Sequence, residues 1–309
     1  MKAHVPAALE GERVDRAVSI LCDVTRSRAA ALVAEGAVRV NGVAVPTRSR
    51  RVAEGEWLEV DVPDSEVEEG LASGGRPEPD PSVDVPVVGA DEAVIVVDKP
   101  PGLVVHPGAG HDRGTMVQGL LARYPDLSGV GERARPGIVH RLDAGTSGLL
   151  VVARTPEAYD SLVAQLSARS VERRYMALVW GHVEAASGLV DAPVGRAPDD
   201  PTRMAVVATG RAARTRYEVL DRFTRPVDAT LLECRLETGR THQVRVHLSA
   251  IGHPVVGDAR YRGQRSSFPA DRPFLHAHRL EFDHPVDGRR RRYTSALPPD
   301  LEALRELLA

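Results

Sequence analysis

Cysteine is scarce in this chain of 309 residues, which contains only Cys22 and Cys234. Two cysteines in different regions supply neither a disulfide framework nor the ligand spacing of a zinc site, and their scarcity fits a reducing cytoplasm. The 11 histidines do not change this expectation, because the two candidate pairs lack an acidic or cysteine partner at ligand spacing; the pairs are His242 with His247 and His276 with His278. We therefore expect structural histidines, no metal site and a cytoplasmic protein.

Long apolar runs are absent as well. The first 15 residues, MKAHVPAALEGERVD, have no apolar core of signal-peptide length, and no run in the chain reaches the length that spans a membrane. The stretch GAGH at 108–111 does not fit a dinucleotide fingerprint, because its third glycine is misplaced and no helix-opening pattern follows directly. A P-loop is also missing. These absences argue against a membrane protein and against a nucleotide cofactor.

Lysine is nearly absent, since only Lys2 and Lys99 occur among the 40 basic residues. Arginine suits planar, bidentate contacts to phosphates and bases, although the codon usage of a GC-rich genome would produce the same bias. The net charge of −3 does not exclude a nucleic-acid partner, because the acidity is concentrated in one segment. Residues 1–62 are neutral, residues 63–91 carry −7, and residues 92–309 carry +4.

The chain divides into three regions. Residues 10–62 have the pattern of a small α+β module, with helices over 12–21 and 26–35, a strand over 38–43 that enters a tight turn, and a strand over 57–62. Residues 63–91 are rich in Pro, Gly, Ser and acidic residues, so they cannot bury a core and are predicted to be a linker. Residues 92–309 form the larger domain.

Helical and strand patterns are mixed in this larger domain. Strands are expected over 94–98, 103–106, 149–153, 172–180, 229–237 and 274–284, with a hairpin over 194–216. Helices are expected over 115–124 and 155–169, and a third begins after Thr241, its candidate N-cap. On that third helix His242, Arg245 and Ser249 share one face.

The segment IVHRLDAGTSGLLVVAR, residues 138–154, places a carboxylate at the mouth of the sheet. A short apolar run leads into His140 to Asp143, small turn-prone residues follow, and then a buried strand begins. Asp143 therefore lies in a tight loop, with Arg141 two residues before it. Loops held by rigid strands often carry catalytic groups, although a surface ion pair between Arg141 and Asp143 is the alternative.

The same segment resembles a known family signature. The string HRLDAGTSGLLVVA is similar to the signature of the ribosomal large-subunit pseudouridine synthases of the RluA type, and PGIVHRLD is most similar to their RluD branch. Four further motifs follow the family order: VVDKPPGLVVHPGAG from Val96, RRYMALVWG from Arg173, LETGRTHQVRVHL from Leu236 and GHPVVGDARY from Gly252. The resemblance covers roughly residues 90 to 300. It implies an α+β catalytic domain built on a long mixed, mainly antiparallel sheet with flanking helices.

The resemblance also implies a reaction and its residues. The family isomerises uridine to pseudouridine in RNA, which needs no redox step, metal or nucleotide cofactor. Asp143 matches the catalytic nucleophile, Tyr175 the tyrosine that stacks under the target base, and Arg245 the arginine that pairs with the aspartate. Arg141 is expected to fill the place of the flipped base or to hold a phosphate. Whether Asp143 attacks the sugar, adds to the base or deprotonates the sugar stays open.

The first region carries a second resemblance. The pattern TRSRAAALVAEGAVRVNG is similar to the small RNA-binding module first seen in ribosomal protein S-four. In that family, basic residues on the second helix and the following loop meet RNA phosphate. The matching or following basic positions are Arg26, Arg28, Arg39, Arg48, Arg50 and Arg51. A solvated charged face is the alternative interpretation.

The combined expectation is a monomeric enzyme that modifies 23S ribosomal RNA and takes part in ribosome biogenesis. A transfer-RNA pseudouridine synthase is the alternative within the same class. An RNA-binding ribosome-assembly factor with incidental catalysis is an alternative from another class. An aspartate-dependent hydrolase would need a second catalytic carboxylate or a metal, for which the chain offers no obvious motif.

Overall fold

The computed structural model describes residues 2–22, 26–61, 76–108, 113–200 and 203–308. Two compact units are present: one comprises residues 1–75 with the short segment 196–204, and the other comprises residues 76–195 with 205–309. Each unit has its own buried core. Within the described residues, none of the helices has the length and apolar character required to cross a bilayer.

The smaller unit combines one sheet with two helices. Its four strands pair in the order β1-β4-β2-β3 and span Lys2–His4 (β1), Val38–Val40 (β2), Val43–Ala44 (β3) and Trp57–Val60 (β4). Helices α1 (Val14–Cys22) and α2 (Arg26–Ala34) follow the predicted positions, and Gly36 ends α2 at φ +73°. Asn41 and Gly42 both have positive φ, which gives the tight turn between β2 and β3.

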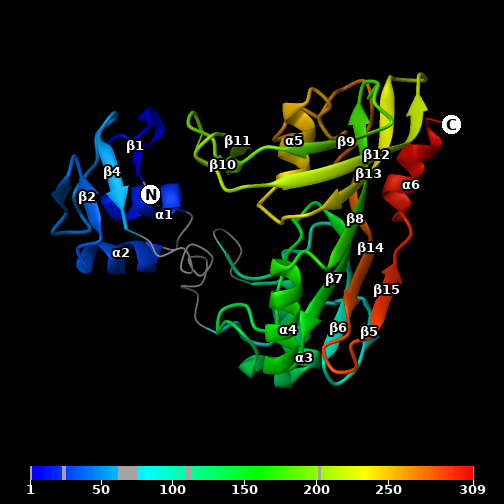
Figure 1. The fold of residues 1–309 in the computed structure, drawn as a ribbon, viewed down its shortest axis with the longest axis horizontal. Coiled ribbons are helices and arrows are strands. Elements are labelled where there is room, and N and C mark those ends of the chain that lie inside the picture. Colours follow the sequence, from blue (N-terminus) through cyan, green and yellow to red (C-terminus); the bar gives the residue numbers. More distant parts are fainter. Residues whose placement is uncertain (1, 23–25, 62–75, 109–112, 201–202, 309) are drawn as a thin grey trace. The chain divides into compact units, whose positions relative to one another are not determined.

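The larger unit is built on one long sheet. Its strands follow the order β5-β6-β7-β14-β8-β13-β12-β9, and β15 pairs with β14 (Figure 1). All neighbours are antiparallel except β7 and β14, which run parallel. The bounds are Val87–Ala90 (β5), Val94–Lys99 (β6), Ser147–Ala153 (β7), Glu172–Trp180 (β8), Ser187–Asp191 (β9), Arg214–Phe223 (β12), Ala229–Leu236 (β13), Leu275–Asp283 (β14) and Arg290–Thr294 (β15). The predicted α+β class with a mixed, mainly antiparallel sheet is confirmed. The predicted hairpin in 194–216 is the separate pair β10 (Val194–Arg196) and β11 (Met204–Val206).

Helices cover both faces of this sheet. In β7, Leu150 and Val152 pack in the same apolar cluster as α3 (Met116–Arg123) and α5 (Gln243–Ala250), whereas Leu149 and Val151 pack in a second cluster with α4 (Pro156–Ser167). This alternation is expected of a strand that is buried on both sides. Helix α6 (Pro299–Glu306) packs against a third cluster that includes Trp180. Figure 1 shows α3 and α4 toward one end of the sheet and α5 toward the other.

A glycine permits the parallel contact between β7 and β14. Gly148 has φ +113°, and a Cβ at this position would lie 2.4 Å from the carbonyl oxygen of Ala277. Only glycine adopts this conformation without strain and lets the two backbones approach so closely. Because β7 begins immediately after the Asp143 loop, this contact fixes the loop relative to β14.

Two predicted segments differ from the structure. The linker expected over 63–91 is shorter, because Val87–Ala90 forms the edge strand β5 on β6 and residues 76–91 belong to the larger unit; residues 62–75 lie outside the described ones. Residues 103–106 are not a strand. The carbonyl oxygens of Val104 and Val105 accept hydrogen bonds from the first N–H groups of α3, Met116 and Val117, so this segment caps a helix instead of joining the sheet.

The helix ends are partly as predicted. Thr115 and Gln118 form a capping box at α3, and the Thr155 hydroxyl accepts a hydrogen bond from the Ala158 N–H at α4. The N-cap of α5 is His242, with φ +56°, and not Thr241. After β14 the chain turns back as β15, a strand that was not predicted and that contains Arg290, Arg291 and Arg292.

Candidate active site

The loop that carries Asp143 is attached to the rigid sheet. The backbone carbonyl of Asp143 accepts a hydrogen bond from the Thr146 N–H at 3.0 Å, and β7 begins at the next residue, Ser147. Lys99, at the end of β6, is fully buried and donates to the carbonyls of Pro100 and Leu103, both at 2.9 Å, and of Ala144 at 3.2 Å. Lys99 therefore ties the turn after β6 to the residue that follows Asp143.

Arg245 joins two carboxylates from different parts of the chain. Its Nη1 donates to Oδ2 of Asp143 at 2.9 Å, while Nε and Nη2 donate to the two oxygens of Asp258 at 2.6 and 2.9 Å. Asp258 is fully buried and also accepts the backbone N–H groups of Arg260 and Tyr261. Asp258 thus holds the guanidinium in a bidentate grip, and the third guanidinium nitrogen is aimed at Asp143.

A histidine and a tyrosine complete the surroundings of the pair. His242 precedes α5, and its Nε2 lies 3.9 Å from Oδ1 of Asp143. Its Nδ1 lies 2.7 Å from the hydroxyl of Tyr261, and the guanidinium of Arg245 lies over the Tyr261 ring at 5.0 Å. The predicted shared face of His242 and Arg245 is therefore the face that contacts Asp143.

These contacts keep Asp143 ionised. Burial alone would raise the pKa of Asp143, but His242, Arg245 and Arg141 lower it by more, and the net pKa lies below the ordinary value. Burial lowers the pKa of His242 to about 4, so this ring is neutral at pH 7. Arg245 stays charged, so its positive charge, followed by its direct hydrogen bond, is the main cause that persists at neutral pH. The result is a carboxylate held in one orientation and able to act as a nucleophile or a base.

Tyr175 lies on the same side of the sheet. It is buried in the main apolar cluster on β8. Burial raises the pKa of Tyr175 to about 12, and the negative charge of Asp143 contributes in the same direction. The phenol is therefore neutral at physiological pH, and the side chain offers an aromatic surface close to the carboxylate.

Arg141 is exposed and makes no ion pair with Asp143 within the described residues. The alternative of a surface pair between these two residues is therefore wrong, because the carboxylate is directed inward to Arg245. Arg141 is still close enough for its charge to lower the pKa of Asp143. Its exposed guanidinium is a permanent cation beside the site.

The six arginines predicted to bind RNA lie in the smaller unit. Arg39, Arg48 and Arg51 are exposed, and Arg50 is partly buried beside Glu56 at 3.1 Å. Arg26 and Arg28 belong to α2, but their side chains lie outside the described part of the structure. The structure places Arg39 on β2 and the other three in the segment between β3 and β4, so their role in RNA binding stays a prediction.

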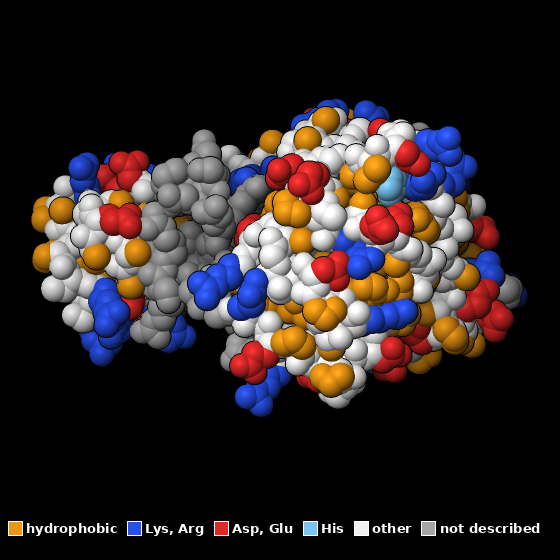
Figure 2. Space-filling model, turned by 90° about the horizontal axis from the view of Figure 1, so that it is seen from below, with side chains coloured by type: hydrophobic (Ala, Val, Ile, Leu, Met, Phe, Trp, Pro, Cys, Tyr) orange, Lys and Arg blue, Asp and Glu red, His pale blue; other side chains and the backbone are white. Residues whose placement is uncertain are grey.

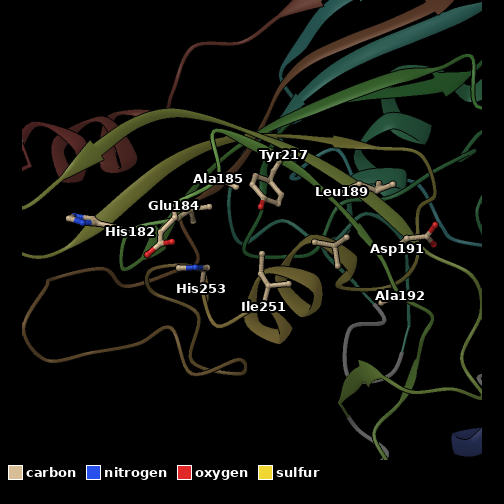
Figure 3. A pocket seen from close by; sticks show the side chains of 11 residues that line it. His182, Glu184, Ala185, Leu189, Asp191, Ala192, Tyr217, Ile251 and His253 are labelled. Carbon is tan, nitrogen blue, oxygen red and sulfur yellow. The ribbon is translucent and has the colours of Figure 1, made fainter.

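Two further features do not compete with this site. In the part of the chain that the structure describes, no three His, Cys, Asp or Glu side chains are grouped as metal ligands. A hollow of about 530 Å³ on the larger unit lies between β9, β12 and the end of α5; Figure 3 shows Tyr217, Ile251 and His253 among its lining residues. None of the candidate catalytic residues lines this hollow.

Sequence reasoning missed several of these residues. Asp258 lies in the motif GHPVVGDARY, which was matched to the family from the sequence. An acidic residue inside a family motif was the signal that could have marked it. Lys99 lies in the motif DKPPG, and the signal there was that it is one of only two lysines in the chain. The pairing of Arg245 with Asp143 was expected from the family resemblance and is present.

Comparisons with known proteins agree with this geometry. The family described as RNA pseudouridylate synthase matches residues 93–250. An uncharacterized RNA pseudouridine synthase of Chloroflexus aurantiacus is 46% identical over 98% of this chain and 92% of its own length. The ribosomal large subunit pseudouridine synthase D of Nitrosomonas europaea is 44% identical over 97% and 85%, respectively. Among solved structures, human RNA pseudouridylate synthase domain containing 1 is similar with a TM-score of 0.57 and 30% identity, covering 74% of this chain and 90% of that one.

Proposed function

Because this chain belongs to the RNA pseudouridylate synthase family, we propose that it isomerises specific uridines of 23S ribosomal RNA with Asp143 as the nucleophile. The enzyme class, an isomerase that forms pseudouridine in RNA, follows from the family itself. The observation that carries the role of Asp143 is its 2.9 Å hydrogen bond with Arg245, which is in turn held by the buried Asp258.

The choice of 23S ribosomal RNA is supported by relatives. The similar proteins of Nitrosomonas europaea and Pseudomonas aeruginosa both bear the name ribosomal large subunit pseudouridine synthase D, and each matches this chain over nearly its whole length. The larger unit carries basic and acidic side chains interspersed over one face (Figure 2). This face has no uniform positive charge, so individual arginines have to supply the phosphate contacts. We assign these contacts to six arginines of the smaller unit: Arg26, Arg28, Arg39, Arg48, Arg50 and Arg51.

The target base has to leave the RNA stack before Asp143 can reach its nucleotide. Enzymes that act on a base flip it into a pocket, and the cost is a few kcal/mol of lost stacking. In our proposal Tyr175 provides the surface on which the flipped uracil stacks. Arg141, which is exposed beside Asp143, occupies the vacated place in the stack or binds a phosphate.

Asp143 then acts on the flipped nucleotide in its ionised form. The pKa of Asp143 below the ordinary value keeps the carboxylate available at neutral pH. Attack on the sugar, addition to the base and removal of a sugar proton all use this form, so the ionised carboxylate serves each route. The reaction joins the same uracil to the same sugar through a different atom, so it consumes no electron donor and no group donor. We extend the proposal to a monomeric, cytoplasmic enzyme that works without a metal or cofactor.

Pseudouridine mapping tests the proposal. Large-subunit ribosomal RNA would be prepared from cells that lack this protein and from the same cells complemented with wild type or Asp143→Asn. Carbodiimide-dependent stops in primer extension mark each pseudouridine. We expect stops that return with wild type and stay absent with Asp143→Asn, while both proteins are folded and bind the RNA.

Other outcomes separate the alternatives. Stops in transfer RNA but not in 23S ribosomal RNA would move the substrate to transfer RNA and leave the chemistry intact. If Asp143→Asn restores the same primer-extension stops as wild type, Asp143 is not the nucleophile. Rescue of ribosome assembly by Asp143→Asn, without any pseudouridine that depends on wild type, would favour the RNA-binding assembly factor.

A further inference from the structure

Two buried nitrogen atoms have no hydrogen-bond acceptor in the described structure: Nε of Arg173, two positions before Tyr175, and Nδ1 of His140, three positions before Asp143. Arg173 is only 8% exposed and stands two residues before Tyr175 in β8, so both side chains project from the same face of the strand. Buried polar groups without partners are rare in folded proteins, and each one requires an explanation.

The unpaired atom of His140 is a donor. Its Nε2 lies 3.2 Å from the backbone nitrogen of Val151, which can only donate, so Nε2 accepts. Burial lowers the pKa of His140 to about 3, and the charge of Arg173 lowers it further, so the ring is neutral at pH 7. A neutral ring that accepts at Nε2 carries its proton at Nδ1. The charge of Arg173 thus acts on this ring, whose free donor is the second unpaired N–H group.

Arg173 also lacks a carboxylate within the described residues, in contrast with its neighbour in the same strand. Arg174 projects from the other face and pairs with Glu233 at 2.6 Å and with Glu172. Burial without a compensating negative charge lowers the pKa of Arg173. A buried cation without a partner destabilises a fold, so a protein that keeps one is expected to use it for a ligand.

The surrounding backbone leaves space for this guanidinium. A Cβ added at Gly239, in the loop between β13 and α5, would lie 2.9 Å from Nη1 of Arg173. The φ of Gly239 is outside the left-handed region, so this glycine is needed for space and not for conformation. The loop therefore places Arg173 at a defined position beside Tyr175.

The chemistry of the two donors selects their ligand. A pair of N–H groups, one of them on a cation, suits an oxygen acceptor that carries or develops negative charge. The phosphates of a bound RNA stay at the mouth of the site, where the exposed Arg141 can meet them. Only the flipped base would enter as deep as Tyr175, and uracil offers two carbonyl oxygens.

We propose that Arg173, together with His140, hydrogen-bonds a carbonyl oxygen of the flipped uracil and stabilises the uracil anion formed when the glycosidic bond breaks. This proposal rests on the function proposed above, in which the base lies against Tyr175. When the bond between C1′ and N1 breaks, its electron pair passes to N1 and is delocalised onto the two carbonyl oxygens. Asp143 either forms a bond to C1′ or removes the proton at C2′. When C5 then bonds to C1′, either the bond from Asp143 to C1′ breaks and its electron pair returns to the carboxylate, or Asp143 gives the proton back to C2′. C5 finally loses its proton and N1 gains one, so the overall change is an isomerisation.

Single-turnover kinetics with an unmodified 23S transcript test this assignment. The transcript contains either uridine or 5-fluorouridine, and loss of the starting nucleoside is followed by chromatography and mass spectrometry. For Arg173→Met we expect a rate about 100-fold lower at saturating enzyme, as for the loss of one donor to a developing oxyanion, with an unchanged RNA dissociation constant. The reduction in rate should be smaller on 5-fluorouridine, because fluorine itself stabilises the uracil anion.

Two further variants serve as comparisons. Arg173→Lys should restore part of the rate. Arg174→Met, from the other face of β8, is the control and should react like wild type.

Stability separates a role in chemistry from a structural one. Removal of an unpaired buried charge should leave the melting temperature of Arg173→Met unchanged or raise it. If the Met variant does not fold, Gly239→Ala provides a second test, because the added methyl group displaces the guanidinium without removing its charge. We expect about a 10-fold lower rate for Gly239→Ala, which is within the effect of a small misplacement.

The remaining outcomes each overturn the assignment. A wild-type rate for Arg173→Met, an equal deficit on both nucleosides, or weaker RNA binding at an unchanged rate would each contradict a contact to the leaving base; the last would indicate a phosphate contact. A melting temperature that falls in step with activity would indicate a structural role. Asp143→Asn, measured in parallel, distinguishes failure of this proposal from failure of the proposed function, because only the latter predicts an active Asp143→Asn.

Discussion

Asp258 and Arg245 form a two-bond ion pair in which the carboxylate is completely buried and the guanidinium is directed at Asp143. The two residues lie 13 positions apart, Arg245 in α5 and Asp258 in the segment that connects α5 to β14. Asp258 also accepts the backbone N–H groups of Arg260 and Tyr261, so the loop itself fixes the carboxylate. The orientation of the arginine at the reactive aspartate is therefore set by a residue that does not touch Asp143.

Asp258→Asn tests this positioning role. The amide keeps the size of the side chain but removes the charge and one acceptor, so Arg245 is no longer held at both nitrogen atoms. We expect kcat to fall about 100-fold while KM for RNA is unchanged, because a small displacement near the reacting group is costly. The free energy of unfolding should fall by about 3 kcal/mol, since a buried pair loses one partner. Steady-state kinetics and urea denaturation measure the two effects.

Asp287→Asn is a matched control for this change. Asp287 is exposed and pairs with Arg291 at 2.7 Å, so its substitution should leave kcat unchanged and have little effect on stability. A wild-type kcat for Asp258→Asn would show that Arg245 needs no support. A higher KM with an unchanged kcat would place Asp258 in RNA binding.

Arg141→Ala should separate activity from stability. Arg141 is exposed, so its removal should change the free energy of unfolding by less than about 0.5 kcal/mol. Activity should fall at least about 10-fold, which corresponds to the loss of one good arginine contact to RNA. The salt dependence of RNA binding distinguishes the two proposed roles: a phosphate contact predicts a salt slope lower by about 1, and an insertion into the RNA stack predicts an unchanged slope. Wild-type turnover would exclude both roles.

Much of the fold follows from local signals in the sequence. The buried strand β8 matches its predicted bounds, 172–180, and α3 and α4 begin at the predicted threonines because Thr115 and Thr155 cap them. The strand predicted at 103–106 was wrong because apolar residues with strand propensity also occur beside helix ends. Here the carbonyls of Val104 and Val105 accept hydrogen bonds from the first N–H groups of α3 and not from a neighbouring strand. Which partner such a segment finds depends on the tertiary fold, and a local pattern does not contain that information.

The candidate site shows the same limit. Asp143, Tyr175 and Arg245 were predicted because family motifs mark them, and the structure brings Arg245 and Asp143 together across 102 positions. Asp258 and Lys99 were not predicted, because their roles exist only through partners distant in the chain: Lys99 reaches Ala144 across 45 positions. A sequence pattern gives residue types at fixed spacing, whereas these contacts depend on how β6, β7 and α5 are assembled.

Gly148→Ala should damage the sheet beside the active site. The added methyl group would lie 2.4 Å from the Ala277 carbonyl oxygen, and the φ of +113° is unfavourable for alanine. We expect a loss of at least about 3 kcal/mol in the free energy of unfolding, from steric overlap combined with backbone strain. Gly129→Ala is the control, because no atom lies within 4 Å of its Cβ position and its φ is not positive. Equal melting temperatures for the two variants would contradict the close approach of β7 and β14.

Lys99 predicts an unusual dependence of stability on pH. Burial lowers the pKa of Lys99 to about 7, although the charge of Asp143 opposes the shift, whereas an unfolded lysine titrates near about 10.4. Between these values the unfolded chain binds one more proton than the folded chain, so stability should rise with pH through this window, by at most about 1.4 kcal/mol per pH unit. Below pH 7 both states are protonated, so stability no longer changes with pH through Lys99, and the destabilisation by the buried ammonium is at its full value. The three carbonyl acceptors around Nζ favour the ammonium, so they limit the shift of the Lys99 pKa.

Urea denaturation of wild type and Lys99→Met from pH 6.5 to about 9.5 measures the effect of Lys99 on stability. The free energy of unfolding of wild type, relative to that of Lys99→Met, should increase as the pH rises. A constant difference over this range would show that Lys99 keeps its proton throughout and that the three carbonyls outweigh burial.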